Sequence, residues 1–245
     1  MSKLGQNFNS AGIGLFLQIL GGNNSLAVPH VSVTDIRTVN WPALKEAGFK
    51  GVIFDKDNTL TRPFALEVEP SLVSSLALCR DTFGTSIALY SNSAGLAQYD
   101  PDGKEAEHLE SLLSIPVLRH TDKKPAGGPA DLEAHFGFAA CELVMVGDRY
   151  LTDVVFGNRL GMLTVRAAPF ARDGEPAGVL AARAIEEFFV ARWLCAGVQP
   201  PAHPLLAQAD VGGGESGGSA GSGGDNQSLT RRFTLPLSKP WTHDS

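Results

Sequence analysis

Short apolar runs alternate with amphipathic stretches through most of the chain. The apolar, β-prone runs predict strands over residues 51–54, 86–90, 116–118, 142–146 and 162–165. Helical periodicity predicts helices over residues 70–83, 104–113, 129–136, 153–160 and 176–194. Because the strands are apolar on both faces and alternate with helices, we expect an α/β fold with a central parallel sheet flanked by helices.

Polar residues follow four of the five predicted strands. Asp55 and Asp57 come directly after the first strand, and Ser91 and Asn92 come after the second. The residues that follow the third and fourth strands are Lys123, Lys124, Asp148 and Asp153. Ligands of open α/β sheets bind outside the carboxyl ends of the strands, so we expect these side chains to meet in one site.

The acids at these strand ends indicate a bound cation. Neighbouring carboxylates repel each other unless a cation lies between them, and a hard divalent ion with oxygen ligands, Mg²⁺, meets that need. We expect Asp55 and Asp148 to bind it through their side chains and Asp57 through its backbone carbonyl. We expect Asp153 to lie just behind these ligands, where it would orient the water molecules of the ion.

The same residues suit phosphoryl transfer, because Mg²⁺ and a lysine together attract a phosphate dianion. Asp55 is expected to attack phosphorus and form an aspartyl-phosphate. Asp57 would protonate the leaving alkoxide and later take a proton from the attacking water, while Lys124 neutralises the charge that develops. The expected substrate contacts are Thr59, Ser91, Asn92, Lys123 and Arg149.

Each of these short motifs has a common structural explanation when it is taken alone. Two acids two positions apart usually lie in a solvated turn, Ser-Asn after a strand is most often a helix cap, and the segment GDRYLTD could bind calcium. A lysine before proline is usually on the surface. The order of the motifs and their position at strand ends favour a shared catalytic site.

The motifs "DKDNTL", "YSNS", "KKP" and "GDRYLTD" resemble, in this order, the four motifs of the haloacid dehalogenase (HAD) phosphatase superfamily. The longer segments "VIFDKDNTLTRP", "IPVLRHTDKKPAGG" and "VMVGDRYLTDVVFGNRLGM" are similar to the eukaryotic phosphatidylglycerophosphate phosphatases of mitochondria and plastids, over roughly residues 29–170. Lys124 matches the motif lysine better than Lys123, because members of the superfamily usually place that lysine directly before proline.

This resemblance implies a Rossmann-like HAD core and an enzyme that hydrolyses phosphatidylglycerophosphate to phosphatidylglycerol, a step that feeds cardiolipin synthesis and photosynthetic membranes. It implies the same roles for Asp55, Asp57, Lys124 and Asp148 as the strand-end chemistry does. The intervals from Asp57 to Asn92 and from Asn92 to Lys124 each already hold a predicted helix and strand. We therefore expect no large cap domain, which leaves the site open to a headgroup still anchored in a bilayer.

Two other functions stay open. An uncapped HAD phosphatase could act on a soluble phosphomonoester or on a phosphoprotein, in which case the apolar N-terminal segment would belong to the core. A catalytically silent, lipid-binding relative is the second alternative. The intact acids Asp55 and Asp57 argue against it, because such a relative commonly loses its nucleophile.

The pattern changes at both ends of the chain. Residues 1–28 form an apolar segment with no acid, which predicts either a helix packed on the domain or an interfacial, membrane-associating helix. Residues 29–200 are the predicted phosphatase domain. Residues 201–245 contain a Gly/Ser-rich stretch, which predicts a flexible linker followed by a C-terminal tail.

Charge and composition limit the classes of binding partner that we expect. The net charge of −6 and the absence of a Lys/Arg stripe with interleaved aromatic residues exclude nucleic acid as a natural partner. The apolar N-terminal segment and basic residues such as Lys123 and Arg149 favour a membrane phospholipid substrate and peripheral contact with an anionic membrane. The resemblance implies a place in the mitochondrion, at the matrix face of the inner membrane, or in the chloroplast.

Overall fold

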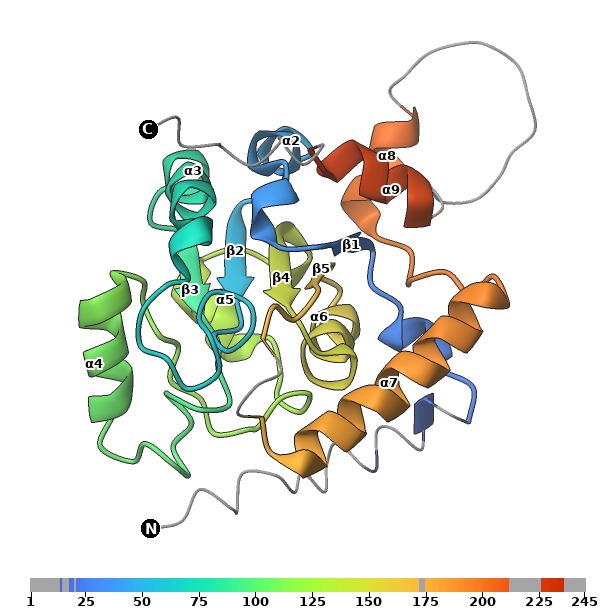
Figure 1. Ribbon diagram of the computed structural model, residues 1–245. Coiled ribbons are helices and arrows are strands. Elements are labelled where there is room, and N and C mark those ends of the chain that lie inside the picture. Colours follow the sequence, from blue (N-terminus) through green and yellow to red (C-terminus); the bar gives the residue numbers. More distant parts are fainter. Residues whose placement is uncertain (1–13, 15–17, 20, 172–174, 212–225, 236–245) are drawn as a thin grey trace, which may run out of the picture.

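A parallel sheet forms the centre of the computed structural model, which describes residues 14, 18–19, 21–171, 175–211 and 226–235. Within these residues five strands lie in the order β1-β5-β4-β2-β3, all parallel to their neighbours (Figure 1). The strands are β1 Val31–Val33, β2 Gly51–Phe54, β3 Ile87–Leu89, β4 Leu143–Gly147 and β5 Leu163–Ala167. β2, β3 and β4 are buried along their whole length. The predicted α/β fold with a central parallel sheet is confirmed.

The structure differs from the sequence prediction at the two edges of this sheet. The predicted strand 116–118 is wrong, because Val117 makes only an isolated parallel bridge to Leu89 at the edge of β3. Pro116 accepts a hydrogen bond from Leu89 N but has no N–H to donate, so the pairing does not extend. The opposite edge strand, β1, was not predicted because its three residues are too short to show a pattern.

The predicted helices are all present, with small shifts at their ends. They are α3 Val73–Phe83 after the 3₁₀ turn Pro70–Leu72, α4 Lys104–Leu113, α5 Ala130–Phe136, α6 Val155–Arg159 after the π-helix Tyr150–Val154, and α7 Ala177–Cys195. Three further helices were not predicted: α2 Trp41–Glu46, α8 Pro204–Val211 and α9 Asn226–Phe233. Single 3₁₀ turns lie at Asn24–Ala27, Ile36–Thr38 and Ala140–Glu142. α2 begins at Asn40, whose side chain accepts a hydrogen bond from Ala43 N.

Alternating residues of the buried strands serve the cores on the two faces of the sheet. In β2, Val52 and Phe54 belong to the larger apolar cluster, which also contains residues of α2, α3, α4 and α9. Ile53, which points to the other face, belongs to the second cluster with residues of α5 and α6. This division explains why β2 is apolar at every position, since helices cover both faces of the sheet.

The connections between the central strands contain no folded cap domain in the part of the chain that the structure describes. The segment from β2 to β3 contains α3, and the segment from β3 to β4 contains α4 and α5. These elements pack on or beside the sheet, as Figure 1 shows. The carboxyl ends of β2, β3 and β4 are therefore not covered by a separate domain, as expected from the sequence.

The last described helix, α9, packs against the domain. Phe233 is fully buried, and its ring meets the ring of Phe49 edge to face. The backbone is also tied to the segment around α2, since Asn40 N donates to Phe233 O and Leu235 N donates to Thr38 O. Part of the segment 201–245 thus adds to the core, while residues 212–225 of the predicted linker lie outside the described residues.

Most of the apolar segment 1–28 also lies outside the described residues, so the predicted interfacial helix there stays a prediction. Ile19 is buried and shares an apolar cluster with Ala27, Val155 of α6 and Val190 of α7. Among the described helices, none is both long and apolar enough to cross a membrane.

Two buried histidines join the N-terminal segment to the region around α8. His30 Nε2 donates to Pro201 O at 3.0 Å, and its Nδ1 accepts a hydrogen bond from Thr164 N of β5. The ring of His203 lies edge-on to that of His30, with 5.6 Å between the ring centroids. Burial, with the neighbouring His203 as a second cause, lowers the pKa of His30 to about 4, and burial lowers the pKa of His203 to about 4. Both rings are therefore neutral in the fold at neutral pH.

These lowered pKa values predict that the two histidines destabilise the fold in mild acid. In the unfolded chain the two rings take up protons near pH 6.5, but in the folded chain they do so only near pH 4, so their contribution to the free energy of unfolding should fall as the pH is lowered between these values. Urea unfolding across this range measures the slope. His30→Gln should reduce the slope, whereas the exposed control His108→Gln should keep it. Equal slopes in wild type and both variants would contradict the assignment.

Candidate active site

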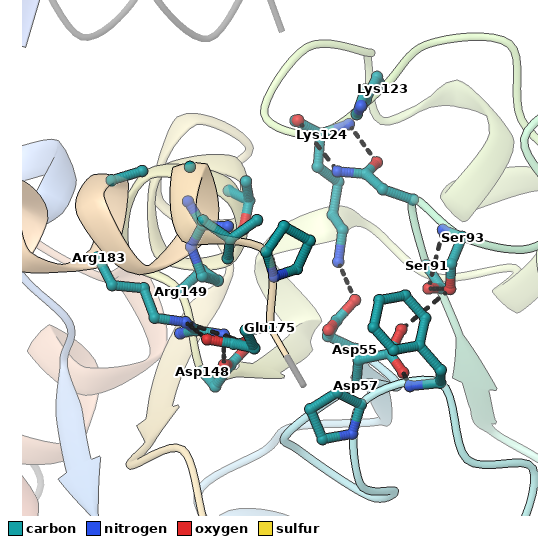
Figure 2. A pocket seen from close by; sticks show the side chains of 18 residues that line it. Asp55, Asp57, Ser91, Ser93, Lys123, Lys124, Asp148, Arg149, Glu175 and Arg183 are labelled. Atoms are coloured by element: carbon teal, nitrogen blue, oxygen red, sulfur yellow. Dashed lines mark hydrogen bonds and ion pairs between the residues drawn. The ribbon is translucent and has the colours of Figure 1, made fainter. Parts of the chain in front are cut away.

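A cleft lies at the carboxyl ends of the central strands and contains most of the residues predicted for the site. β2 and β4 deliver Asp55 and Asp148 to its floor, while the loop after β3 contributes Ser91 and Asn92. Lys124 enters from the loop before α5. The first half of α7 forms the opposite wall, as Figure 2 shows for Arg183. The strand-end residues therefore meet in one place, as the fold requires.

Lys124 connects two of the acids. Its Nζ lies 2.8 Å from Asp55 Oδ1 and 2.6 Å from Asp153 Oδ1. The side chains of Lys124 and Asp153 are each only 1% exposed. Burial alone would lower the pKa of Lys124, but the carboxylates of Asp153 and Asp55 outweigh that effect and raise it. Lys124 therefore keeps its charge inside the protein, and that charge is directed at Asp55.

Three carboxylates form a cluster with the chemistry of a metal site. One oxygen each from Asp55, Asp148 and Asp153 lies within 4.8 Å of the others. Burial raises the pKa of Asp148 to about 8, with Arg183 opposing the shift and Asp153 adding to it. Burial likewise raises the pKa of Asp55 to about 6, with Lys124 opposing the shift and Asp153 adding to it. A cation between these groups would favour their charged forms.

The donor set fits a hard divalent cation. All three donors are carboxylate oxygens, which Mg²⁺ and Ca²⁺ prefer. Oδ2 of Asp148 is buried and makes no hydrogen bond with any described residue, although Arg183 Nη2 forms an ion pair with it at 2.5 Å. Gly147 provides the space for this arrangement, because a Cβ built there would overlap the carboxyl group of Asp153. The site thus contains a buried carboxylate oxygen that is paired with Arg183 and a backbone adapted to bring Asp153 close.

This geometry modifies the expected ligand set at one position. The carboxylate of Asp153, predicted to lie behind the ligands, is itself a member of the cluster. The side chain of Asp57 lies outside the cluster and lines the cleft. It accepts hydrogen bonds from Lys56 Nζ at 2.6 Å, Phe64 N at 2.9 Å and Ser93 Oγ at 3.1 Å. This position is compatible with the expectation that Asp57 meets a metal only through its backbone.

The predicted substrate contacts fall into two groups. Ser91 lines the cleft, and its Oγ lies 2.9 Å from Ser93 Oγ. Asn92 also lines the cleft, but its side chain accepts from Lys124 N and donates to Lys124 O. It therefore holds the lysine loop in place. Thr59 is 1% exposed and does not line the cleft, so the structure does not bring its hydroxyl to the position expected for a phosphate contact.

Lys123 and Arg149 line the cleft beside the acid cluster. Burial lowers the pKa of Lys123, and the charge of Arg149 adds to this effect. Arg149 forms an ion pair with Glu186 of α7 at 2.5 Å, so its guanidinium is held against that helix. These two side chains place positive charge at the edge of the cleft, outside the position of Lys124.

Helix α7 also contributes to the site, which was not predicted from the sequence. Arg183 Nη2 lies 2.5 Å from Asp148 Oδ2 and 2.6 Å from Glu175 Oε1, and its side chain is 6% exposed. Glu175 also accepts a hydrogen bond from Asn58 Nδ2. A signal was present, because Arg183 and Glu186 are spaced three residues apart on a helix whose other side is apolar. It was not interpreted, since no strand end marks these positions. Ser93 was likewise visible in "YSNS".

Fold and site together define the class of protein: the chain order in which acids, hydroxyls and lysine meet at this sheet edge is that of the HAD phosphatases. The family described as "Mitochondrial PGP phosphatase", in which PGP stands for phosphatidylglycerophosphate, matches residues 12–169, and the chain belongs to this family.

Three relatives illustrate its range. The chloroplastic phosphatidylglycerophosphate phosphatase 1 of Chlamydomonas reinhardtii is 65% identical over 205 residues, which cover 84% of this chain and 76% of that protein. The chloroplastic/mitochondrial phosphatidylglycerophosphate phosphatase 1 of Arabidopsis thaliana is 47% identical over 84% of this chain, but the match spans 59% of that protein. A probable phosphatase of Bacillus subtilis is 27% identical over 59% of this chain and 78% of its own length. No solved structure matches the chain significantly.

The acid cluster predicts a binding site for a divalent cation that depends on Asp148. Mg²⁺ should raise the melting temperature of the wild-type protein, because a ligand of the folded state alone stabilises it, and chelation should reverse the effect. Asp148→Asn should weaken Mg²⁺ binding by about tenfold or more in calorimetric titration. The exposed acid Asp122 offers a matched control, and Asp122→Asn should bind as the wild type does. Equal Mg²⁺ affinity in both variants would contradict the site.

Proposed function

We propose that this chain is a Mg²⁺-dependent phosphatase that hydrolyses phosphatidylglycerophosphate to phosphatidylglycerol and phosphate through an aspartyl-phosphate at Asp55. The observation that carries this proposal is the position of Asp55. Its carboxylate ends β2 in the open cleft, is 14% exposed, and is held by Lys124 at 2.8 Å. The substrate is taken from the relatives, two of which bear the name phosphatidylglycerophosphate phosphatase at 65% and 47% identity.

In the first step Asp55 attacks the terminal phosphorus. A bond forms between a carboxylate oxygen and phosphorus, and the ester bond from phosphorus to the glycerol oxygen breaks. Asp57 donates the proton that converts the leaving alkoxide to a hydroxyl group. Ser93 Oγ and Phe64 N, which both bind the Asp57 carboxyl group, hold it at the edge of the cleft for this transfer. Lys124 balances negative charge on Asp55 and the phosphoryl oxygens.

In the second step a water molecule attacks the phosphorus of the aspartyl-phosphate. Asp57, now ionised, takes a proton from this water, and the bond from phosphorus to Asp55 breaks. Free phosphate leaves, and Asp55 is again a carboxylate. Mg²⁺, held by Asp55, Asp148 and Asp153 with the backbone carbonyl of Asp57, would supply positive charge that offsets repulsion between the phosphate dianion and the acids.

The open cleft supports a lipid substrate. In the described part of the chain no cap domain separates the sheet edge from the outside, so a headgroup can enter while its acyl chains stay in a bilayer. The headgroup also carries a phosphodiester, and Lys123 and Arg149 lie at the edge of the cleft where they would meet this second negative charge. A soluble phosphomonoester has no such group and would use only part of the site.

We place the enzyme at an organelle membrane, as a peripheral protein. The relatives quoted above are chloroplastic or chloroplastic/mitochondrial, and one in Saccharomyces cerevisiae is mitochondrial. These names support the chloroplast or the mitochondrion, and for the mitochondrion we propose the matrix face of the inner membrane. The product, phosphatidylglycerol, would serve there as a membrane lipid and as the precursor of cardiolipin.

Phosphate release in the presence of Mg²⁺ tests this proposal directly. Phosphatidylglycerophosphate in vesicles should be hydrolysed far faster than glycerol 3-phosphate. Asp55→Asn should lower the release by roughly 10³-fold or more, because the nucleophile is lost, while the exposed variant Asp102→Asn should match the wild type. Undiminished release by Asp55→Asn would refute the mechanism, and equal turnover of glycerol 3-phosphate would remove the lipid from the proposal.

A further inference from the structure

Helix α7 buries two charged residues and exposes large apolar ones, unlike an ordinary surface helix. Its charged residues Arg183 and Glu186 are 6% and 2% exposed, whereas Phe188 is 66% exposed. A surface helix normally buries its apolar stripe and turns its charges to water. This arrangement exposes apolar area that the surface of a soluble monomer does not usually keep, so we expect a binding partner or a membrane to cover this side of the helix.

The inward side of α7 is polar because the active site needs it. Arg183 binds Asp148, and Glu186 binds Arg149 at 2.5 Å. The outward positions of the helix do not face these charged residues of the active site. They comprise Leu180, Ala181, Ala184, Ile185, Phe188 and Ala191, which we call the outward face of α7. Of the other charged residues of this helix, Arg192 is exposed, and Glu187, with a side chain that is 36% exposed, pairs with Arg166 of β5.

The outward face continues into the mouth of the active-site cleft. Gly178 and Ala182 line the cleft, and Ile185, 48% exposed, follows three residues after Ala182 on the same edge of the helix. Phe64, which lines the cleft on the loop after β2, is 50% exposed, and Leu66, two residues further along that loop, is 44% exposed. Apolar side chains therefore flank the entrance on both sides. In Figure 1, α7 starts beside the carboxyl edge of the sheet and runs along the outside of the molecule.

We propose that the outward face of α7, with Phe64 and Leu66, docks on a lipid bilayer so that a lipid headgroup enters the cleft without leaving the membrane. This inference rests on the proposed lipid substrate. A helix that lies in the interface buries its apolar side among the acyl chains and turns its polar side away from them, which is the orientation that α7 has relative to the protein. Arg192 adds a positive charge at the edge of this face.

The position of the face favours a bilayer over a protein partner. A protein that covered Ile185 and Phe188 would border the cleft entrance and hinder a substrate anchored in a membrane, whereas a bilayer in the same place delivers that substrate. The chain carries a net charge of −6, so overall attraction to an anionic membrane is not available. Insertion of apolar side chains close to the cleft supplies the missing attraction.

The test is flotation of the full-length protein with vesicles of phosphatidylcholine and phosphatidylglycerol that contain no substrate. The double variant Ile185→Gln/Phe188→Gln keeps good helix formers but removes the apolar side chains, and its partitioning onto vesicles should fall by about tenfold or more. A control changes two exposed leucines on α3 and α4, Leu78 (41% exposed) and Leu112 (48% exposed), to Gln, and it should partition as the wild type does. The conservative pair Ile185→Val/Phe188→Leu should retain partitioning.

Activity separates docking from catalysis. With phosphatidylglycerophosphate in vesicles, the Gln double variant should lose kcat/KM in proportion to its partitioning. With a short-chain, monomeric form of the same lipid in solution, it should match the wild type. Flotation uses substrate-free vesicles, so it measures docking whatever lipid the enzyme hydrolyses. The proposed function is tested separately, by phosphate release from phosphatidylglycerophosphate vesicles by the wild type.

Two outcomes would overturn the inference. Wild-type partitioning by the Gln double variant would show that the membrane contact, if any, lies elsewhere, for instance in residues 1–28. A change from dimer to monomer in sedimentation, with unchanged flotation, would show that the outward face of α7 is covered by a second copy of the chain.

Discussion

The ion pairs of the buried Lys124 with Asp55 and Asp153 are the constraint on which the rest of the site depends. Three carboxylates converge at the carboxyl edge of the sheet, and one lysine cannot balance them. Removing one partner from a buried pair of this kind typically costs about 3–5 kcal/mol, because it leaves a charge without compensation. The fold supplies a second positive charge from α7, where Arg183 binds Asp148, and the chemistry of the cluster calls for a divalent cation as well.

This requirement for positive charge links the catalytic centre to the outer surface of the protein. Arg183 and Glu186 face inward to bind Asp148 and Arg149, while apolar residues of the same helix such as Ile185 and Phe188 face outward. A helix that completes an active site on one side and offers an apolar surface on the other is suited to an enzyme that works on a lipid. The electrostatics of the cluster and the proposed membrane contact would thus both follow from one helix orientation.

Site residues could be predicted from the sequence where they lie directly after a strand. Asp55, Asp57 and Asp148 were predictable because they directly follow apolar runs that could only be buried strands, and parallel strands bring their ends to one edge. Arg183 and Glu175 were not predictable in this way, because their roles depend on how α7 packs across the sheet edge. Similarly, β1 has three residues and gains its stability from β5, and Phe233 of α9 is buried only because a core cluster receives it. Thr59 was expected to contact the substrate because it lies near a motif, but burial depends on the tertiary fold, and in the structure Thr59 is 1% exposed and does not line the cleft.

Asp55 is proposed to carry the phosphoryl group during turnover, and trapping the aspartyl-phosphate is a direct test of this role. The protein would be mixed with phosphatidylglycerophosphate vesicles and Mg²⁺, quenched within a turnover, and treated with borohydride, which reduces an acyl phosphate to an alcohol. Peptide mass spectrometry should then find homoserine in place of aspartate at position 55, and only when substrate is present. Hydrolysis of the lipid with no such conversion at Asp55, or with conversion at Asp57 instead, would contradict the account.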